Sequence, residues 1–231
     1  MRGKLFALVV IATLVGLTYS YLISQTYPFV LASEKARTSL EVTAEQTAEL
    51  NAAKYASDLI AFGIFGALIC SIVAIVGTYP GGAKHRLQTL AIGCLLGAVG
   101  GVVMGIVGYI FRDAMHNTIS DPMVHVFARL ATMFLPVALA VGLTMAFASR
   151  SKQTLANATM GAVVGALFTS LFYGILSGLI TPLEIVDFVL PAHATNRYLL
   201  FLTAFLAIAV VSFLQVARTT VPKVVETNEP A

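Results

Sequence analysis

One predicted helix face carries an imidazole between a carboxylate and a guanidinium group. Asp121, His125 and Arg129 follow one another at intervals of four residues, which places all three on one side of an α-helix. Imidazole and carboxylate groups together are suitable ligands for divalent transition metals. Further groups of these two kinds lie upstream, at Asp113, and in the next loop that we expect on the same side of the membrane. The sequence therefore offers one candidate metal site, made of His116, Asp121, His125, Glu184, Asp187 and His193.

The same residues also suit a polar cap at the membrane interface, and we favour this interpretation. The sequence contains neither an HxH nor an HExxH pattern, the close spacings of metal-binding segments. Asp121 can cap a helix that starts at Pro122, and Arg129 can extend its long side chain toward lipid headgroups. We therefore expect no bound metal and no cofactor.

The remaining reactive side chains do not form a catalytic pattern. Cys70 and Cys94 lie in apolar runs without a CxxC pattern, and they could face each other or serve as small apolar residues. Ser177 lies between glycines, but the segment Gly174–Gly178 lacks the spacing of a GxSG motif, and no histidine lies at the same membrane depth. We therefore expect that the protein is not an enzyme.

The composition shows which elements must position these residues. The 231 residues are 58% apolar and only 11% charged, whereas ordinary globular chains are roughly one quarter charged. This balance excludes a disordered chain, a disulfide-linked secreted domain and a nucleic-acid-binding protein. Six apolar runs are long enough, at about 20 residues each, to cross a membrane as helices: residues 5–24, 59–78, 87–111, 126–147, 158–180 and 198–216. The sequence therefore predicts an all-α polytopic membrane protein, with one six-helix transmembrane domain over residues 1–231.

The charges between the runs predict the orientation of the chain. With both termini in the cytoplasm, the inner segments carry eight of the 14 Lys and Arg residues, although they are much shorter than the outer ones. Nine of the 11 acidic residues then lie outside. The first run follows Met1–Lys4 as a signal peptide would, but it is long and lacks a good cleavage site, so we interpret it as an uncleaved span. We expect an integral protein of a bacterial inner membrane.

Two of the outer segments contain helix signals. Segment 43–46 has the Thr-x-x-Gln spacing of a capping box, and neither glycine nor proline follows before residue 59. This predicts one continuous helix from about Ala44 to Thr78, with its first turns on the outer side of the membrane. Between spans five and six, Thr181 as a cap and Pro182 as the first helical residue predict a short apolar helix along the interface.

Small residues recur at every fourth position in two of the spans, and such stripes allow two membrane helices to approach closely. We expect close helix packing at Gly93, Gly97, Gly101 and Gly105 in the third span and at Gly161, Gly165, Gly174 and Gly178 in the fifth. The stripes could also form the seam of a homo-oligomer. The fifth span could instead line a polar path with Thr169, Tyr173 and Ser177.

Two further features suit movement. Pro136, near the middle of the fourth span, removes a backbone hydrogen bond and predicts a kink. The segments Gln88–Ala91 and Gln153–Ala156 are identical, so that spans two–three and four–five could be duplicated hairpins, as in some transporters.

The predicted spans contain almost no ionisable side chains. Apart from Arg129 near the outer end of the fourth span, they hold no Asp, Glu, Lys, Arg or His. Charged groups at membrane depth usually mark proton relays and ion sites. We therefore expect a non-catalytic subunit or scaffold of a membrane assembly, in contact with lipid and with other membrane subunits or a second copy, but not with nucleic acid. The alternative is a small-solute or ion transporter or channel without a buried charged relay.

Overall fold

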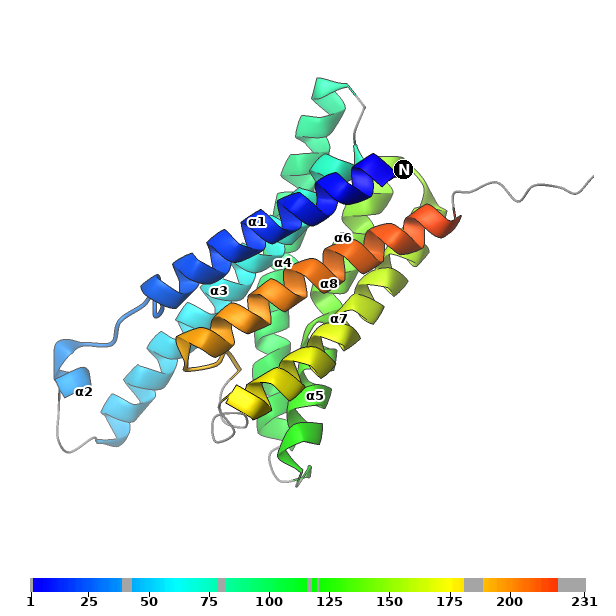
Figure 1. Cartoon of the computed structure of the whole chain (residues 1–231). Coiled ribbons are helices and arrows are strands. Elements are labelled where there is room, and N and C mark those ends of the chain that lie inside the picture. The colour runs from blue at the N-terminus through cyan, green and yellow to red at the C-terminus, as the bar shows by residue number, and fades with distance from the viewer. Residues whose placement is uncertain are drawn as a thin grey trace, which may run out of the picture.

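The computed structural model describes residues 2–38, 43–78, 82–115, 118–119, 121–180 and 189–219. Over these residues the regular structure is entirely helical (Figure 1). The helices are α1 (Arg2–Thr26), α2 (Glu34–Thr38), α3 (Ala44–Gly77), α4 (Ala83–Met115), α5 (Pro122–Met133), α6 (Leu135–Ser149), α7 (Lys152–Ile180) and α8 (Ala194–Thr219). Within this described part of the chain, six stretches are long and apolar enough to cross a membrane: Gly3–Thr26, Ala44–Gly77, Ala83–Ala114, Met123–Ser149, Lys152–Ile180 and Ala194–Ala217. The predicted all-α fold with six candidate membrane spans is confirmed.

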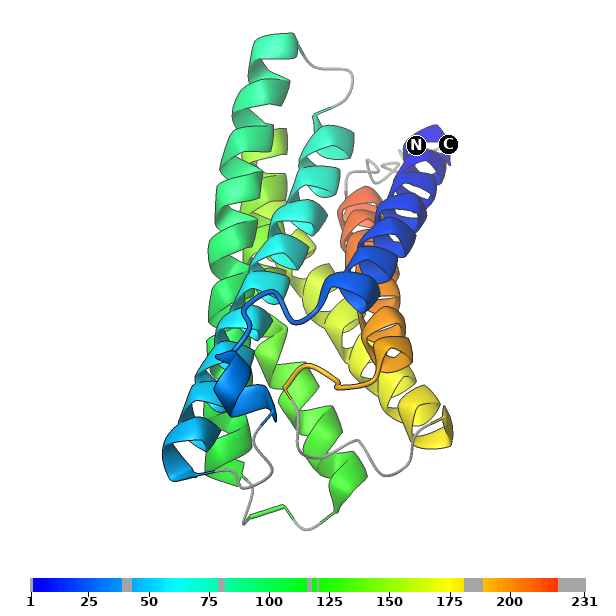
Figure 2. The ribbon, with the colours of Figure 1, turned by 90° about the vertical axis from the view of Figure 1, so that its left-hand side faces the viewer.

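The long helices run up and down, so each end of the bundle gathers particular segments (Figures 1 and 2). The start of α1 and the end of α8 lie at one end, which we call the terminus end. α2 lies at the opposite end, the α2 end, together with the start of α3 and the start of α8. Along the bundle α3 packs on α4, α7 on α8 and α1 on α8, while α6 contacts both α4 and α7.

α3 begins at a capping box. The Thr43 side chain accepts a hydrogen bond from the amide of Gln46 (3.3 Å), and the Gln46 side chain accepts one from the amide of Thr43 (2.9 Å). The helix then continues without a break over Ala44–Gly77. That its first turns stand outside the membrane stays a prediction. The predicted interfacial helix falls mainly on residues 181–188, which lie outside the described residues.

The fourth span consists of two helices in line, α5 and α6. Asp121 caps α5 by accepting hydrogen bonds from the amides of its second and third residues (2.8 and 3.1 Å). The helix is interrupted at Phe134, two residues before Pro136, where the sequence predicts a kink. Hydrogen bonding continues across the interruption, because the amide of Ala138 donates to the carbonyl of Phe134 (2.9 Å).

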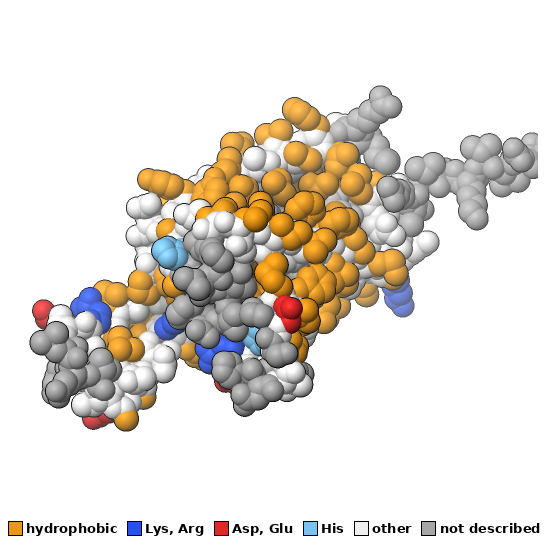
Figure 3. All heavy atoms as spheres, turned by 60° about the horizontal axis from the view of Figure 1, so that its bottom comes forward, with side chains coloured by type: hydrophobic (Ala, Val, Ile, Leu, Met, Phe, Trp, Pro, Cys, Tyr) orange, Lys and Arg blue, Asp and Glu red, His pale blue; other side chains and the backbone are white. Residues whose placement is uncertain are grey.

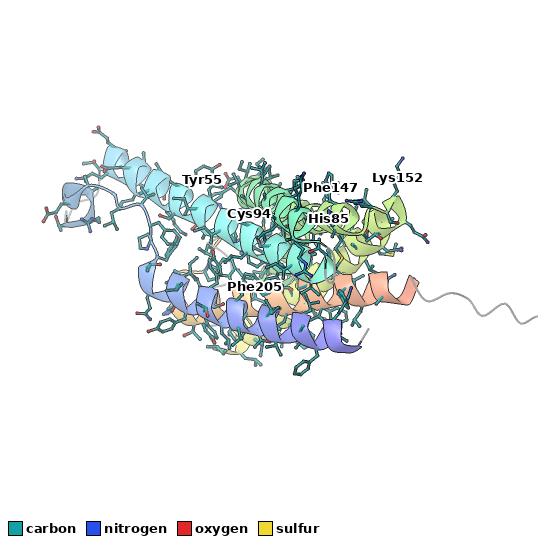
Figure 4. All side chains as sticks on the ribbon, turned by 90° about the horizontal axis from the view of Figure 1, so that it is seen from above. Tyr55, His85, Cys94, Phe147, Lys152 and Phe205 are labelled. Carbon is teal, nitrogen blue, oxygen red and sulfur yellow. The ribbon has the colours of Figure 1, made fainter. Side chains whose placement is uncertain are left out.

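Aromatic side chains fill the centre of the bundle. The largest fully buried side chains include Phe62 and Phe65 of α3, Phe134 between α5 and α6, and Phe201 and Phe205 of α8. Tyr19 of α1 packs edge-on against Phe201, with 5.0 Å between the ring centroids, and Phe65 packs edge-on against Phe205 at 4.9 Å. Phe205 lies among the helices in Figure 4. The two ends of the bundle are thus separated by a core of packed rings.

The flanks of the bundle expose an apolar surface (Figure 3). Large side chains such as Phe6 (72% exposed), Leu95 (67%) and Leu179 (77%) point outward from α1, α4 and α7. Soluble monomers rarely expose continuous apolar areas of more than a few hundred Å². Charged side chains gather at the α2 end in the same view. This distribution is that of an integral membrane protein, with its flanks in lipid.

Candidate functional site

α3 and α4 meet backbone to backbone along the glycine stripe of α4. A Cβ atom added at Gly97 would lie 2.6 Å from the carbonyl carbon of Gly66, and one added at Gly101 would lie 2.6 Å from that of Phe62. The two outer glycines of the stripe would meet side chains of neighbouring helices at 2.9 and 2.7 Å. Since Cβ atoms are essentially never found so close to other atoms, a side chain would force the two helices apart. The partner of this stripe is therefore another helix of the same chain.

The stripe of α7 makes a similar contact with α8, but over fewer residues. A Cβ at Gly161 would lie 2.7 Å from the Cα of Ser212, and one at Gly165 would lie 2.6 Å from the carbonyl oxygen of Ala207. Gly174 differs, because a Cβ there would meet nothing within 4 Å. The close contact between α7 and α8 thus lies along the first half of α7.

The three residues of the predicted polar path, Thr169, Tyr173 and Ser177, are buried. Thr169 and Ser177 donate to carbonyl oxygens in the preceding turn (3.0 and 3.3 Å). A hollow of about 510 Å³ between α1, α7 and α8 is lined by Thr169 but by neither Tyr173 nor Ser177. The residues of the predicted polar path are therefore not all gathered around this hollow. Gly178, the last glycine of the stripe in α7, is partly exposed.

The described members of the predicted metal cluster have separate surroundings. Asp121 is exposed and caps α5, whereas His125 is buried (2% exposed) beside the ring of Phe111. His193 is exposed, and Asp113 forms an ion pair with its neighbour Arg112 (2.8 Å). Among the residues that the structure describes, no three His, Cys, Asp or Glu side chains are placed to hold a metal ion. Three members of the cluster, His116, Glu184 and Asp187, lie outside the described residues.

The expectation that Arg129 extends toward the headgroups is wrong. Its side chain is only 3% exposed and lies inside the bundle. There it is close enough to Lys54 of α3 for their two charges to interact. His125 and Arg129 thus turn inward, whereas Asp121 stays exposed. Arg129 lies near a charged centre that the sequence does not single out.

This centre is built on Asp58, a carboxylate that is completely buried. The hydroxyl of Tyr27 donates a hydrogen bond to one carboxylate oxygen of Asp58, and the hydroxyl of Tyr109 donates to the other, both at 2.6 Å. The backbone of Leu190 adds a third hydrogen bond. Both oxygens of the Asp58 side chain therefore have hydrogen-bond partners, as a buried polar group requires.

Basic side chains surround the carboxylate. Lys54 lies one turn before Asp58 on α3, within electrostatic range of Asp58 and of Arg197 in the first turn of α8. The guanidinium of Arg197 stacks on the ring of Tyr27, 4.6 Å from its centroid, and that of Arg112 stacks on Tyr109 at 4.8 Å. We call Tyr27, Lys54, Asp58, Tyr109 and Arg197 the Asp58 centre.

The Asp58 centre joins elements that lie far apart in the sequence. Tyr27 follows the end of α1, Tyr109 belongs to α4 and Arg197 to α8, while Asp58 is supplied by α3. Beside Asp58, the hydroxyl of Ser57 accepts a hydrogen bond from the amide of Val30 (2.9 Å) and so attaches the segment after α1 to α3. The centre therefore fixes the arrangement of the helices at the α2 end.

The environment keeps the phenol of Tyr27 in its donating form. Burial raises the pKa of Tyr27 above its usual value, and the negative charge of Asp58 raises it further. The phenol therefore stays protonated, and continues to donate to Asp58, over the physiological pH range.

Asp58 is not predicted from the sequence because it directly precedes the apolar run that begins at residue 59. Asp58 is therefore not among the charges inside the predicted spans. The expectation that the protein buries almost no charged side chain does not hold at the α2 end. One available signal is the spacing of Lys54 and Asp58, which share a face of a predicted helix. The tyrosines that complete the centre carry no such signal.

The two cysteines have different environments. Cys70 is buried at the contact between α3 and α4, whereas Cys94 is exposed, and both are free thiols. Cys70 lies within electrostatic range of Cys94.

Comparison with known proteins adds no family to this geometry. The chain matches no protein-family model, no curated protein and no solved structure.

Proposed function

We propose that the protein is a non-catalytic subunit or scaffold of a membrane assembly. The observation that carries this proposal is the α2–α3 arm, residues 31–38 and 43–53, which projects from the bundle at the α2 end (Figures 1 and 4). Most side chains in the first turns of α3 are exposed. The arm is nevertheless held together, because Glu49 accepts hydrogen bonds from the amide (2.6 Å) and the hydroxyl (3.1 Å) of Ser33. A projecting helix with a fixed position offers a constant surface to a neighbouring subunit.

The rest of the molecule supports the arm as a rigid base. The glycine contact holds α3 and α4 backbone to backbone, and packed aromatic rings fill the centre. The carboxylate of Asp58 is enclosed by its donors, which is typical of a group that holds a structure together.

Site-specific photo-crosslinking in the native membrane tests this proposal. A photoreactive residue is placed at Thr47 or Asn51 on the exposed side of the arm, and at Leu95 or Phe147 on the lipid-facing flank as controls. We expect discrete protein adducts from the arm positions and none of the same size from the flank positions. If the arm positions give no protein adduct and the extracted chain has the size of a monomer, the proposal is wrong.

A second candidate function, small-solute transport, is favoured by one observation. Asp58 is buried within a helix long enough to span the membrane, and transporters keep costly charged groups in such positions because their substrates use them. Swelling of vesicles that contain the purified protein can be measured with small neutral solutes and small carboxylates. Uptake that is lost in Asp58→Asn supports transport, whereas permeability equal to that of protein-free vesicles excludes it for these solutes.

A further inference from the structure

A hollow at the α2 end combines basic and apolar walls. It has a volume of about 450 Å³ and lies between the segment after α1, the first turns of α3 and the start of α8. Arg37, Lys54 and Arg197 line it, and the described residues around it include no acidic side chain. Val30, Leu31 and Leu50 supply apolar wall. This size is within the range of small-ligand pockets, which is roughly 300–1,000 Å³.

We propose that this hollow binds an amphipathic anion, in which a carboxylate or phosphate group is attached to an apolar chain. Guanidinium and ammonium groups together are the usual partners of carboxylate and phosphate oxygens. The apolar wall beside them would contact the first carbons of the attached chain.

One of the basic groups is held in place before any ligand arrives. Arg197 donates from its Nη1 atom to the carbonyl oxygens of Pro191 (2.9 Å) and Ala192, and its guanidinium stacks on Tyr27. A cation that is already ordered loses little side-chain entropy when it binds an anion. Lys54 is partly buried and Arg37 is exposed, so the basic groups extend from the inside of the hollow to its mouth.

The nearby carboxylate does not oppose this assignment. Asp58 is completely buried, is enclosed by the hydroxyls of Tyr27 and Tyr109, and does not line the hollow. Its charge interacts with that of Lys54.

The same chemistry could come from an anionic phospholipid headgroup or from a soluble amphiphile such as a fatty-acid anion. The chain contains no tryptophan, so one tryptophan introduced at Leu31 reports on the hollow alone. Leu95→Trp, on the exposed flank of α4, is the control, because it reports an amphiphile that enters the detergent micelle without binding in the hollow. Octyl phosphate and octyltrimethylammonium are titrated against both, because they share a chain and differ in charge.

We expect octyl phosphate to give a saturable fluorescence change in Leu31→Trp and not in Leu95→Trp. In the Leu31→Trp protein, a second substitution, Arg37→Gln or Lys54→Gln, should weaken this binding about tenfold, since each removes a charged hydrogen-bond donor. Lys152→Gln, at the far end of the molecule in Figure 4, should leave it unchanged. Arg37 is exposed, so that its variant tests the site even if Lys54→Gln fails to fold.

Native mass spectrometry after extraction from phosphatidylglycerol or phosphatidylcholine nanodiscs separates the two sources. The ligand is a lipid headgroup if the wild type retains phosphatidylglycerol, both Lys54→Gln and Arg37→Gln lose it, and octyl phosphate gives little response. Binding of octyl phosphate without retained lipid indicates a soluble amphiphile. Equal responses to the anionic and cationic probes, no binding of either kind, or affinities unchanged in both variants would overturn the proposal.

Discussion

Replacing Gly97 with alanine should separate α3 from α4, although it adds a single methyl group. The new Cβ would lie 2.6 Å from the carbonyl carbon of Gly66, whereas ordinary van der Waals contact begins at 3.4 Å. The atom in the way belongs to the backbone, so it cannot rotate aside as a side chain would. The two helices must therefore move apart locally by at least about 0.8 Å, the difference between these two distances, because the carbonyl oxygen of Gly66 lies closer still to the added Cβ.

The cost of this movement follows from the dispersion contacts that it weakens. The dispersion attraction of one pair of atoms in contact is about 0.1–0.2 kcal/mol. A gap of about 0.5–1 Å removes about a quarter to a half of this attraction. For a patch with about 40–60 pairs, the number that one buried leucine makes, the loss is about 1–6 kcal/mol. Alanine recovers about 0.5–1 kcal/mol through its better helix propensity. The two terms leave a net loss between about 0 and 5.5 kcal/mol. Within this range we expect about 1–3 kcal/mol in the free energy of unfolding, as for other overpacked cores.

Gly174→Ala is the matched control on α7, because its Cβ would meet nothing within 4 Å. This variant should keep the stability of the wild type or gain up to about 1 kcal/mol from helix propensity. Reversible unfolding in mixed detergent micelles, followed by circular dichroism, measures both variants. If Gly97→Ala is as stable as the wild type and as Gly174→Ala, the backbone contact between α3 and α4 does not exist as described.

Four further predictions concern the ends of the molecule. Tyr27→Phe removes one of the donors to the buried Asp58 carboxylate and should lower the free energy of unfolding by about 1–3 kcal/mol, measured in the same micelles. Because the folded pKa of Tyr27 is raised, wild-type stability should fall as the pH rises above about 10, the unfolded value, and a pH series should show a smaller fall in Tyr27→Phe. Single cysteines at Glu45 and Ser151 should react with impermeant reagents from opposite sides of the membrane; labelling of both from one side contradicts the six-span orientation. His125→Ala should leave the metal content unchanged by elemental analysis, and stoichiometric zinc or copper that disappears in the variant would restore the metal interpretation.

The fold could be predicted because its signals are local. Hydropathy over about 20 residues identifies a span, and Thr43 with Gln46 or Asp121 with Pro122 marks the start of a helix within one turn. The four-residue spacing of glycines in α4 predicts a close contact in the same way, but it does not say which helix is the partner. The structure supplies that partner, α3.

The Asp58 centre could not be predicted because it depends on contacts between distant residues. Tyr27 and Tyr109 are 31 and 51 positions away from Asp58, and neither has a neighbour in the sequence that points to a carboxylate. The position of the Arg129 side chain could not be predicted either. A long basic side chain near the end of a span suits the membrane interface, yet the packing of α5 turns it inward.

The glycine contact between α3 and α4 also has a consequence for biosynthesis. These helices are consecutive, and a chain emerges from the ribosome with its N-terminus first, so the hairpin can close before α8 has been made. By then the nascent chain already contains both tyrosines that hold Asp58, whereas Arg197 arrives with the last helix. Both side-chain donors to the Asp58 carboxylate are therefore present within the first half of the chain. α8 then closes the α2 end by placing its arginine over Tyr27.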